Sequence, residues 1–320
     1  MIQYEHVTLI SEVCSMTLTS LPPIAEALDG AVDLHCHSGP NPFSREFDHV
    51  EAARDGERLN MRGILVKSHH HNTVMDLLAM HRELDDVATP IFGGIALNAQ
   101  VGGLNPYAVA MSLQMGGRAV WFPTFSSRCH CENEHHGFPE SDYDIPNRIV
   151  DVVDAEGRLV DAAHEVVDLV AEADVLLSAG HLEPAQSAQL FAAAAERGVR
   201  RMILSHPNFI VDADVERCRQ LAALGGYIEH EVGMYDPQGF RKWDPALLVK
   251  WIRAIGPDHT VLSSDLGQRG RPMPVDAFMR VGEALLDQGL SVEELRQVTS
   301  HNAAFLLGLD DERPASVEGR

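Results

Sequence analysis

VDLHCHSGP, residues 32–40, is the stretch from which the fold can be predicted. It is an apolar run that ends in two histidines, His35 and His37. Side chains alternate between the two faces of an extended strand, so both imidazoles point the same way and Cys36 points the other way. Two imidazoles on one face can share one metal ion. The alternative is a surface strand that carries two histidines by chance, and the rest of the chain decides between these interpretations.

Seven further short apolar runs follow, and each is succeeded by a stretch with helical periodicity. These runs lie within residues 63–71, 91–98, 119–125, 175–181, 200–208, 226–232 and 260–268. Eight strands that alternate with helices predict an α/β protein of the (β/α)8 type, a TIM barrel. A doubly wound open sheet is the alternative. It is disfavoured because no glycine-rich phosphate-binding turn follows the first strand.

The alternation is interrupted between the fourth and fifth strands. Residues 126–147 are too polar and too rich in turn-forming residues for a helix or a strand, and residues 149–160 predict a small β-hairpin around AEG. The loop is rich in metal-binding side chains: Cys129, His130, Cys131, Glu134, His135 and His136. Because these lack the paired spacing of structural zinc modules, we expect a lid or substrate-binding loop, in which His130 or His135 reaches the substrate, rather than a separate zinc site.

Composition and charge exclude several classes of function. The chain has 320 residues and a formal net charge of −22, which argues against nucleic-acid and membrane partners, because both require clustered Lys and Arg. No apolar run approaches the roughly 20 residues that span a bilayer, and no secretory signal pattern is present. Five cysteines with irregular spacing do not indicate a disulfide framework. We therefore expect a cytoplasmic protein with a small-molecule substrate, and a homo-oligomer as a weaker expectation.

The domain organisation follows from the same patterns. We predict one domain over residues 1–309, in which residues 1–30 form an N-terminal cap segment that ends at Gly30. Residues 310–320 are polar and predict a flexible tail.

Polar residues recur at the ends of the predicted strands. In a parallel barrel the carboxyl ends of all strands meet at one rim, where active sites form. A single histidine there is usually a buried residue with satisfied hydrogen bonds, but a whole set at the same rim is hard to attribute to chance. The set consists of His35, His37, Lys67, His69, His181, His206, Glu229 to Glu231 and Asp265.

These motifs resemble those of the amidohydrolase superfamily over nearly the whole barrel. The resemblance rests on DLHCH, SAGHLEP, LSHPN and SSDLGQ after strands one, five, six and eight, and on the closing HNAAFLLGL. It implies that the metal ligands are His35, His37, His181 and Asp265, and that His206 is a second-metal ligand or a group that polarises the substrate.

The sequence also departs from the family pattern. AVWFPTF ends strand four without the bridging Lys or Glu that binuclear members use, so one metal ion is favoured over two. Lys67 is open to three roles: carboxylated ligand, substrate-carboxylate binder or structural residue. His69 would suit a phosphoesterase of the related PHP group, but Asn98 stands where those enzymes carry an acidic residue. Additional candidates for second-metal or substrate binding are Lys67, His69, His130, Glu229 and Arg45.

The chemistry that the resemblance implies is metal-dependent hydrolysis of an amide, imide, lactam, ester or lactone. Zn2+ fits imidazole and carboxylate ligands, as do Mn2+, Fe2+ and Co2+. Asp265 would move the proton of the attacking water, and His206 would polarise the carbonyl group. The alternatives are a mononuclear decarboxylase of the same superfamily, a PHP-like phosphoesterase, and a catalytically silent barrel that only binds. Arg45 would suit a substrate carboxylate, although loop arginines are commonly solvated surface residues.

Overall fold

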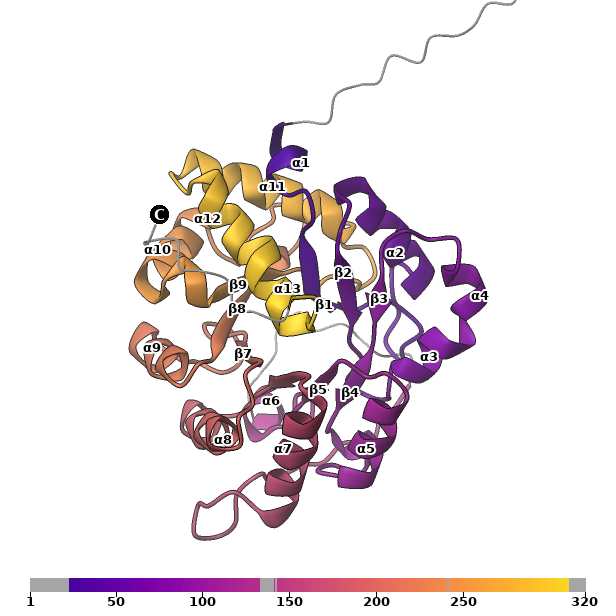
Figure 1. The fold of residues 1–320 in the computed structure, drawn as a ribbon, viewed down its shortest axis with the longest axis vertical. Coiled ribbons are helices and arrows are strands. Elements are labelled where there is room, and N and C mark those ends of the chain that lie inside the picture. Colours follow the sequence, from indigo (N-terminus) through magenta and orange to yellow (C-terminus); the bar gives the residue numbers. More distant parts are fainter. Residues whose placement is uncertain (1–22, 133–140, 142, 241, 311–320) are drawn as a thin grey trace, which may run out of the picture.

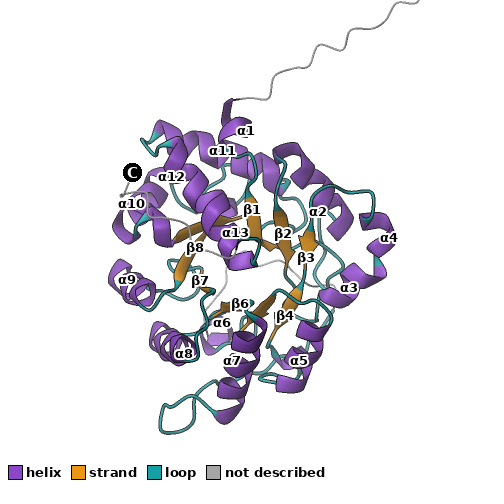
Figure 2. Ribbon diagram, viewed as in Figure 1, coloured by secondary structure: helices purple, strands orange, loops and turns teal. Residues whose placement is uncertain are grey.

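A ring of parallel strands surrounded by helices forms the centre of the molecule (Figures 1 and 2). The structure is a computed structural model, and it describes residues 23–132, 141, 143–240 and 242–310. The first sheet contains β1 (Val32–Cys36), β2 (Gly63–Val66) and β3 (Ile91–Phe92). The second contains β4 (Gly94–Ala96), β5 (Ala119–Trp121), β6 (Leu176–Ser178), β7 (Met202–Ser205), β8 (Tyr227–Glu231) and β9 (Thr260–Ser263).

The two sheets are parts of one barrel. β3 and β4 are a single predicted strand that is interrupted at Gly93, where a Cβ would lie 2.8 Å from the backbone nitrogen of Val74. At the other seam, Asp265 N–H donates to the His35 carbonyl at 2.8 Å and His37 N–H donates to the Leu266 carbonyl at 2.7 Å. These bonds join the end of β9 to β1 and close the ring. The prediction of an eight-stranded α/β barrel is confirmed.

Helices cover the outside of the ring between successive strands (Figure 1). The helices of the described residues are α1 (Pro23–Ala27), α2 (His49–Gly56), α3 (Val74–Ala79), α4 (His81–Leu84), α5 (Pro106–Gln114), α6 (Arg128–Glu132), α7 (Asp161–Ala173), α8 (Pro184–Glu196), α9 (Val215–Ala223), α10 (Pro245–Ile255), α11 (Pro274–Asp287), α12 (Val292–Arg296) and α13 (Asn302–Leu307), and α13 lies across one mouth of the ring rather than outside it. Short 3-10 turns occupy Glu57–Leu59, Ala99–Val101, Val232–Met234 and Pro257–His259, and a π-helical turn occupies Gln297–His301. None of the described helices is both long and apolar enough to cross a lipid bilayer.

The local signals in the sequence explain several helix starts. Asp48 caps α2: its side chain accepts from Glu51 N–H at 2.8 Å, and the Glu51 carboxylate accepts from Asp48 N–H at 2.9 Å. Proline stands in the first turn of α5, α8, α10 and α11, where its missing N–H leaves no helical bond unmade. The capping pattern of Asp48 and Glu51 thus sets the start of α2.

Three details differ from the expectations. The helix predicted after β2 is divided into α3 and α4 at Met80, and α4 contains no buried residue. The loop of residues 126–147 contains the short helix α6. The predicted hairpin of residues 149–160 is present as one antiparallel bridge between Val153 and Leu159, with the Asp154 N–H bonded to the Arg158 carbonyl at 2.8 Å.

One mouth of the barrel is closed by α13, which crosses the ring in Figure 1. Asn302 Nδ2 donates to the carbonyls of Pro257 and Thr260 at 2.7 Å, and Arg201 donates to the Phe305 carbonyl. Because Thr260 opens β9 and Arg201 precedes β7, α13 covers the amino ends of the strands. The carboxyl ends, which carry the predicted site residues, lie at the opposite mouth. Of the predicted cap segment, residues 1–30, and the predicted tail, residues 310–320, the parts at 1–22 and 311–320 lie outside the described residues.

Gly180, directly before His181, occupies a position that no other residue can take without disturbing the barrel. Its backbone is left-handed, with φ of +61°, and a Cβ would lie 2.2 Å from the Phe122 carbonyl oxygen. Gly198 has a similar φ of +79°, but a Cβ added there would meet nothing within 4 Å. Gly180→Ala should therefore lower the free energy of unfolding by about 1–3 kcal/mol more than Gly198→Ala, which suffers only the backbone strain. Urea unfolding of both variants measures this difference, and equal losses would contradict the crowding.

Candidate metal centre

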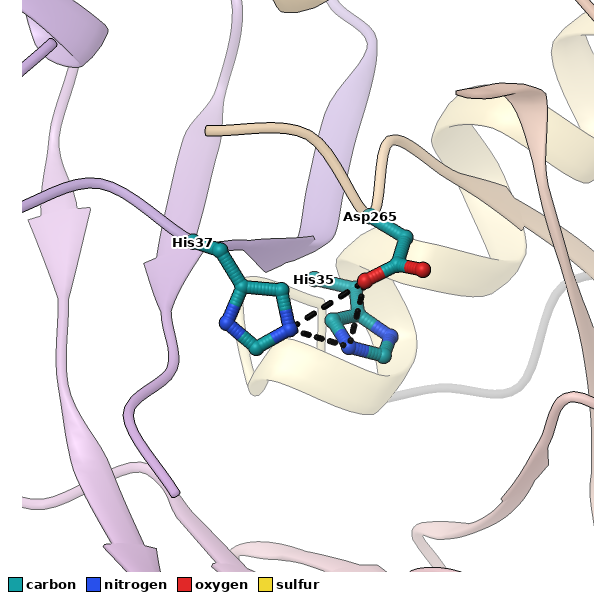
Figure 3. A group of neighbouring side chains, drawn as sticks. All are labelled: His35, His37 and Asp265. Atoms are coloured by element: carbon teal, nitrogen blue, oxygen red, sulfur yellow. Dashed lines mark hydrogen bonds and ion pairs between the residues drawn. The ribbon is translucent and has the colours of Figure 1, made fainter. Parts of the chain in front are cut away.

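Three side chains from the seam between β1 and β9 converge on one point (Figure 3). His35 Nε2 lies 3.2 Å from His37 Nε2 and 3.4 Å from Asp265 Oδ1, and His37 Nε2 lies 3.1 Å from the same oxygen. All three residues are buried. The prediction that the two histidines of the first strand share a face is confirmed, and Asp265 lies beside them.

The Nδ1 atom of each of the two imidazoles, His35 and His37, lies within hydrogen-bonding distance of an oxygen atom. His37 Nδ1 donates to the Lys67 carbonyl at 3.0 Å, and His35 Nδ1 lies 3.1 Å from the Glu229 carboxylate. Burial lowers the pKa of His37 to about 3, so this ring is neutral and its Nε2 carries a lone pair. The contact of His35 Nδ1 with Glu229 leaves His35 Nε2 facing His37 Nε2 at 3.2 Å. Two such ring nitrogens on one face suit a shared metal ion, and each has a partner on its other nitrogen.

Asp265 supplies negative charge to the same point. Burial would raise the pKa of its carboxyl group, but His35 and His37 lower the pKa below its usual range, so the group is ionised at neutral pH. The backbone of Asp265 is left-handed, with φ of +50°. Its N–H donates to the His35 carbonyl, and its own carbonyl accepts from Gln268 Nε2 at 3.0 Å. These bonds hold the carboxylate against the two imidazoles.

A second group of candidate ligands consists of His35, His206 and Glu231. Glu231 Oε1 accepts from His206 N–H at 2.9 Å and lies 3.0 Å from His206 Nδ1. Burial lowers the pKa of His206, but Glu231 and Asp265 raise it, and the net pKa is raised. Both groups use His35, so they adjoin each other.

Glu231 belongs to the predicted rim set, but the sequence analysis did not name it as a candidate ligand or substrate-binding residue. It lies on the same face of β8 as Glu229, two residues further toward the rim, so strand alternation was the signal that could have found it. Asp33 was not recognised as a site residue either. It lies on the face of β1 that carries His35. Its Oδ1 accepts from the backbone N–H of His35 at 3.0 Å and of Ser264 at 2.9 Å, which ties β1 to β9 beneath the site.

His181 lies at the same rim but outside both three-residue groups. Its ring centroid is 5.1 Å from that of His206 and 6.0 Å from that of His69. Neither of its ring nitrogens has a hydrogen-bond partner among the described residues, and burial lowers its pKa well below the usual value. A neutral, buried imidazole without a partner suits a metal ligand, and the role of His181 stays a prediction.

Lys67 and His69 follow β2 into the site. Lys67 Nζ lies 3.0 Å from His35 Nε2, and burial lowers the pKa of this buried amine to about 8. The His69 ring is 5.0 Å from that of His37, and its Nδ1 lies 2.8 Å from Thr124 Oγ1. The structure thus places both residues beside the candidate ligands, while their roles remain predictions.

Asn98 is structural. Its Nδ2 donates to the His69 carbonyl at 2.8 Å and to Thr124 Oγ1 at 2.7 Å, and its Oδ1 accepts from the backbone N–H groups of Thr124 and Ser126. All of its hydrogen-bonding capacity is engaged in holding the ends of β2, β4 and β5 together. This argues against the phosphoesterase interpretation, which places an acidic ligand here.

The loop after β5 brings one histidine to the rim. His130, on α6, is buried, and its ring stacks on that of His181 at a centroid distance of 5.5 Å. Cys131 Sγ lies 3.5 Å from Asn147 Nδ2, and no metal-binding group that includes a cysteine occurs among the described residues. Glu134, His135 and His136 lie outside the described residues. Within the described part of the loop, His130 is the histidine that reaches the rim, and its predicted contact with a substrate stays a prediction.

Solved structures of similar fold are enzymes of several kinds. An amidohydrolase from Pseudomonas aeruginosa has a TM-score of 0.60 and 14% identity, covering 88% of this chain and 97% of its own. The probable dipeptidase PvdM from the same organism has a TM-score of 0.60 and 14% identity, over 89% and 96% of the chains. A 2,6-dihydroxybenzoate decarboxylase from Rhizobium has a TM-score of 0.53 and 12% identity, over 88% and 99%. At these identities the likeness shows the fold alone.

The sequence comparisons give a family without an activity. No curated protein matches the sequence. The profile of one family, described as a family of unknown function, matches residues 30–229, which include the strands from β1 to β7 and most of the candidate ligands. The barrel therefore has the amidohydrolase superfamily fold, and the chain belongs to the family of unknown function DUF6282.

Proposed function

We propose that this protein is a metal-dependent hydrolase that cleaves a C–N bond of an amide, imide or lactam, or the bond of an ester or lactone, in a small molecule. The observation that supports this most strongly is the convergence of His35 Nε2, His37 Nε2 and Asp265 Oδ1 within 3.1–3.4 Å of one another. Two neutral imidazoles and one carboxylate are a donor set for a divalent metal. Their outer nitrogens are already held by Glu229 and the Lys67 carbonyl, as in other metal sites.

The ligand atoms of these side chains also restrict which metal ions fit the site. Nitrogen and oxygen ligands fit Zn2+, and Mn2+, Fe2+ and Co2+ fit as well. His35 belongs to both candidate groups, and the described end of β5 contributes no bridging Lys or Glu. We therefore propose one ion, held by His35, His37 and Asp265, with His181 and His206 as the remaining ligands or near neighbours.

The residues of the chain can each perform a defined task. His35, His37 and Asp265 would hold a divalent metal, which would supply a lower pKa for water and a polarised carbonyl group. Asp265, which is ionised, can accept a proton at its carboxylate and return it to the leaving group. His206, whose pKa is raised by Glu231, can present an N–H to the developing oxyanion. Glu229 holds the orientation of His35.

Decarboxylation is the second candidate. The observation that favours it is the combination of one metal group with Arg45, a cation that could hold the carboxylate of an aryl acid. Both reactions use the same metal and differ in their products, so product analysis separates them.

A substrate screen of the metal-loaded, full-length protein tests the proposal. The panel contains amides, lactams, lactones and aryl carboxylates, with acid release and CO2 release measured in parallel. We expect hydrolysis of at least one amide or lactone class, its loss after chelation, and its return with one equivalent of metal. CO2 release without hydrolysis would replace the proposal by the decarboxylase. Absence of any turnover by a metal-loaded protein would favour a barrel that only binds its ligand.

A further inference from the structure

Arg45 lies between the two loops that carry the candidate metal ligands. Its backbone pairs antiparallel with Gln268, so the loop after His37 and the loop after Asp265 meet at this residue. Its side chain packs over Gly39, where an added Cβ would lie 3.5 Å from Arg45 Cβ. The position of Arg45 is thus fixed by the same two loops that position the metal centre.

Several buried polar atoms around Arg45 have no partner among the described residues. They are Arg45 Nε, both ring nitrogens of His70, and Gln268 Oε1. A buried donor or acceptor without a partner loses its hydrogen bonds to water and gains nothing in return, so native proteins contain few of them. Four such atoms at one place, next to a candidate catalytic centre, indicate that a ligand completes their hydrogen bonds.

The charge of Arg45 interacts with those of Asp265 and His70, so the three side chains lie near one another. Burial lowers the pKa of Arg45 to about 10, while Asp265 raises it. The charge of Arg45 in turn lowers the pKa of His37 and of His70. Burial, with the charges of Arg45 and His71, brings the pKa of His70 to about 4, so His70 is neutral at neutral pH and offers one N–H donor. The place therefore contains one positive charge, that of Arg45, and one neutral donor, His70.

Aromatic rings line the same place. The Phe43 ring lies 5.2 Å from that of His70 and 6.0 Å from that of Phe125, and the His70 and Phe125 rings are 5.1 Å apart. Flat apolar walls beside a single cation suit a carboxylate that is attached to a planar or apolar carbon skeleton.

We propose that Arg45 binds a carboxylate of the substrate, with His70 as a second donor, while the bond to be cleaved lies at the metal centre. This inference rests on the proposed function and names its substrate class as small carboxylic acids. A guanidinium pairs with a carboxylate through two parallel N–H···O bonds. A phosphate dianion would require more than one cation, and in a chain with a formal net charge of −22 each anion needs a dedicated positive group.

Calorimetric titration of the metal-loaded protein with benzoate tests this inference, with benzamide as the uncharged probe of the same shape. We expect benzoate to bind at least about tenfold more tightly than benzamide, and Arg45→Met to weaken benzoate binding about 10- to 100-fold. Arg45→Lys should retain part of the affinity. Arg269→Met is the matched control, because Arg269 is exposed in the loop after β9 and should leave the affinity unchanged. Metal content and melting temperature of each variant establish that it is folded and loaded.

Three results would overturn the inference. If benzoate binds Arg45→Met as tightly as it binds the wild type, the metal alone holds it. Inorganic phosphate that binds through Arg45 more tightly than benzoate would indicate a phosphoester substrate. Absence of benzoate binding to the wild type would leave Arg45 as a structural residue. Each of these results leaves the metal content and the hydrolysis of uncharged esters unaffected, so failure of the inference is distinguishable from failure of the proposed function.

Discussion

Asp265→Asn should bind Zn2+ at least about 100-fold more weakly than the wild type, because the substitution removes the one negative charge among the three converging ligands. The amide oxygen of Asn is a weak neutral ligand, and its NH2 group would face two imidazoles. The backbone should be undisturbed, since Asn tolerates the left-handed conformation that Asp265 adopts at φ of +50°. Hydrolysis should be lost with the metal. Competition with a chromogenic chelator measures the affinity.

Asp212→Asn is the matched control for this substitution. Asp212 lies in the loop after β7, is exposed, and has a left-handed backbone with φ of +53°. It belongs to neither candidate metal group. We expect its metal affinity to equal that of the wild type. Equal affinities for both variants and the wild type would show that Asp265 is not a ligand.

Glu229→Gln should weaken metal binding about 10- to 100-fold, the usual effect of removing a partner that orients a ligating histidine. The Glu229 carboxylate lies 3.1 Å from His35 Nδ1 and is buried. Burial would raise the pKa of Glu229, but His35 lowers it, so the group is charged and makes His35 a stronger donor toward a metal. Glutamine retains the shape but removes this charge. The same chelator competition gives the affinity.

Two further variants complete this experiment. The first is the control, and the second can contradict the prediction. Glu183→Gln changes an exposed carboxylate in the loop after β6 and should have no effect. Glu231→Gln should act through His206 and reduce activity more than metal affinity. Greater loss of metal in Glu231→Gln than in Glu229→Gln would place the ion in the group of His35, His206 and Glu231 instead.

The barrel could be predicted because its signals are local. Each strand is a short apolar run followed by a helix, and capping patterns such as Asp48 with Glu51 mark helix starts. Strand alternation predicted that His35 and His37 share a face, and the barrel rule predicted that Asp265 joins them at the rim. The comparisons confirm the superfamily fold, while the roles of the individual ligands stay predictions.

The remaining features depend on contacts between distant segments. Asn98 could be seen as a departure from the phosphoesterase pattern, but its bonds to His69, Thr124 and Ser126 arise only when three strand ends meet. Arg45 could not be told from a solvated surface arginine, because its burial depends on the loop that carries Gln268. Local sequence contains no information on such packing.

Elemental analysis of the full-length protein, purified without chelators, asks whether the converging histidines and aspartate hold a metal. We expect about one divalent transition-metal ion per chain, which is lost on dialysis against a chelator and regained from one equivalent of Zn2+. A protein that is folded but contains no metal, and that takes up none from Zn2+ solution, would rule out a metal centre at His35, His37 and Asp265.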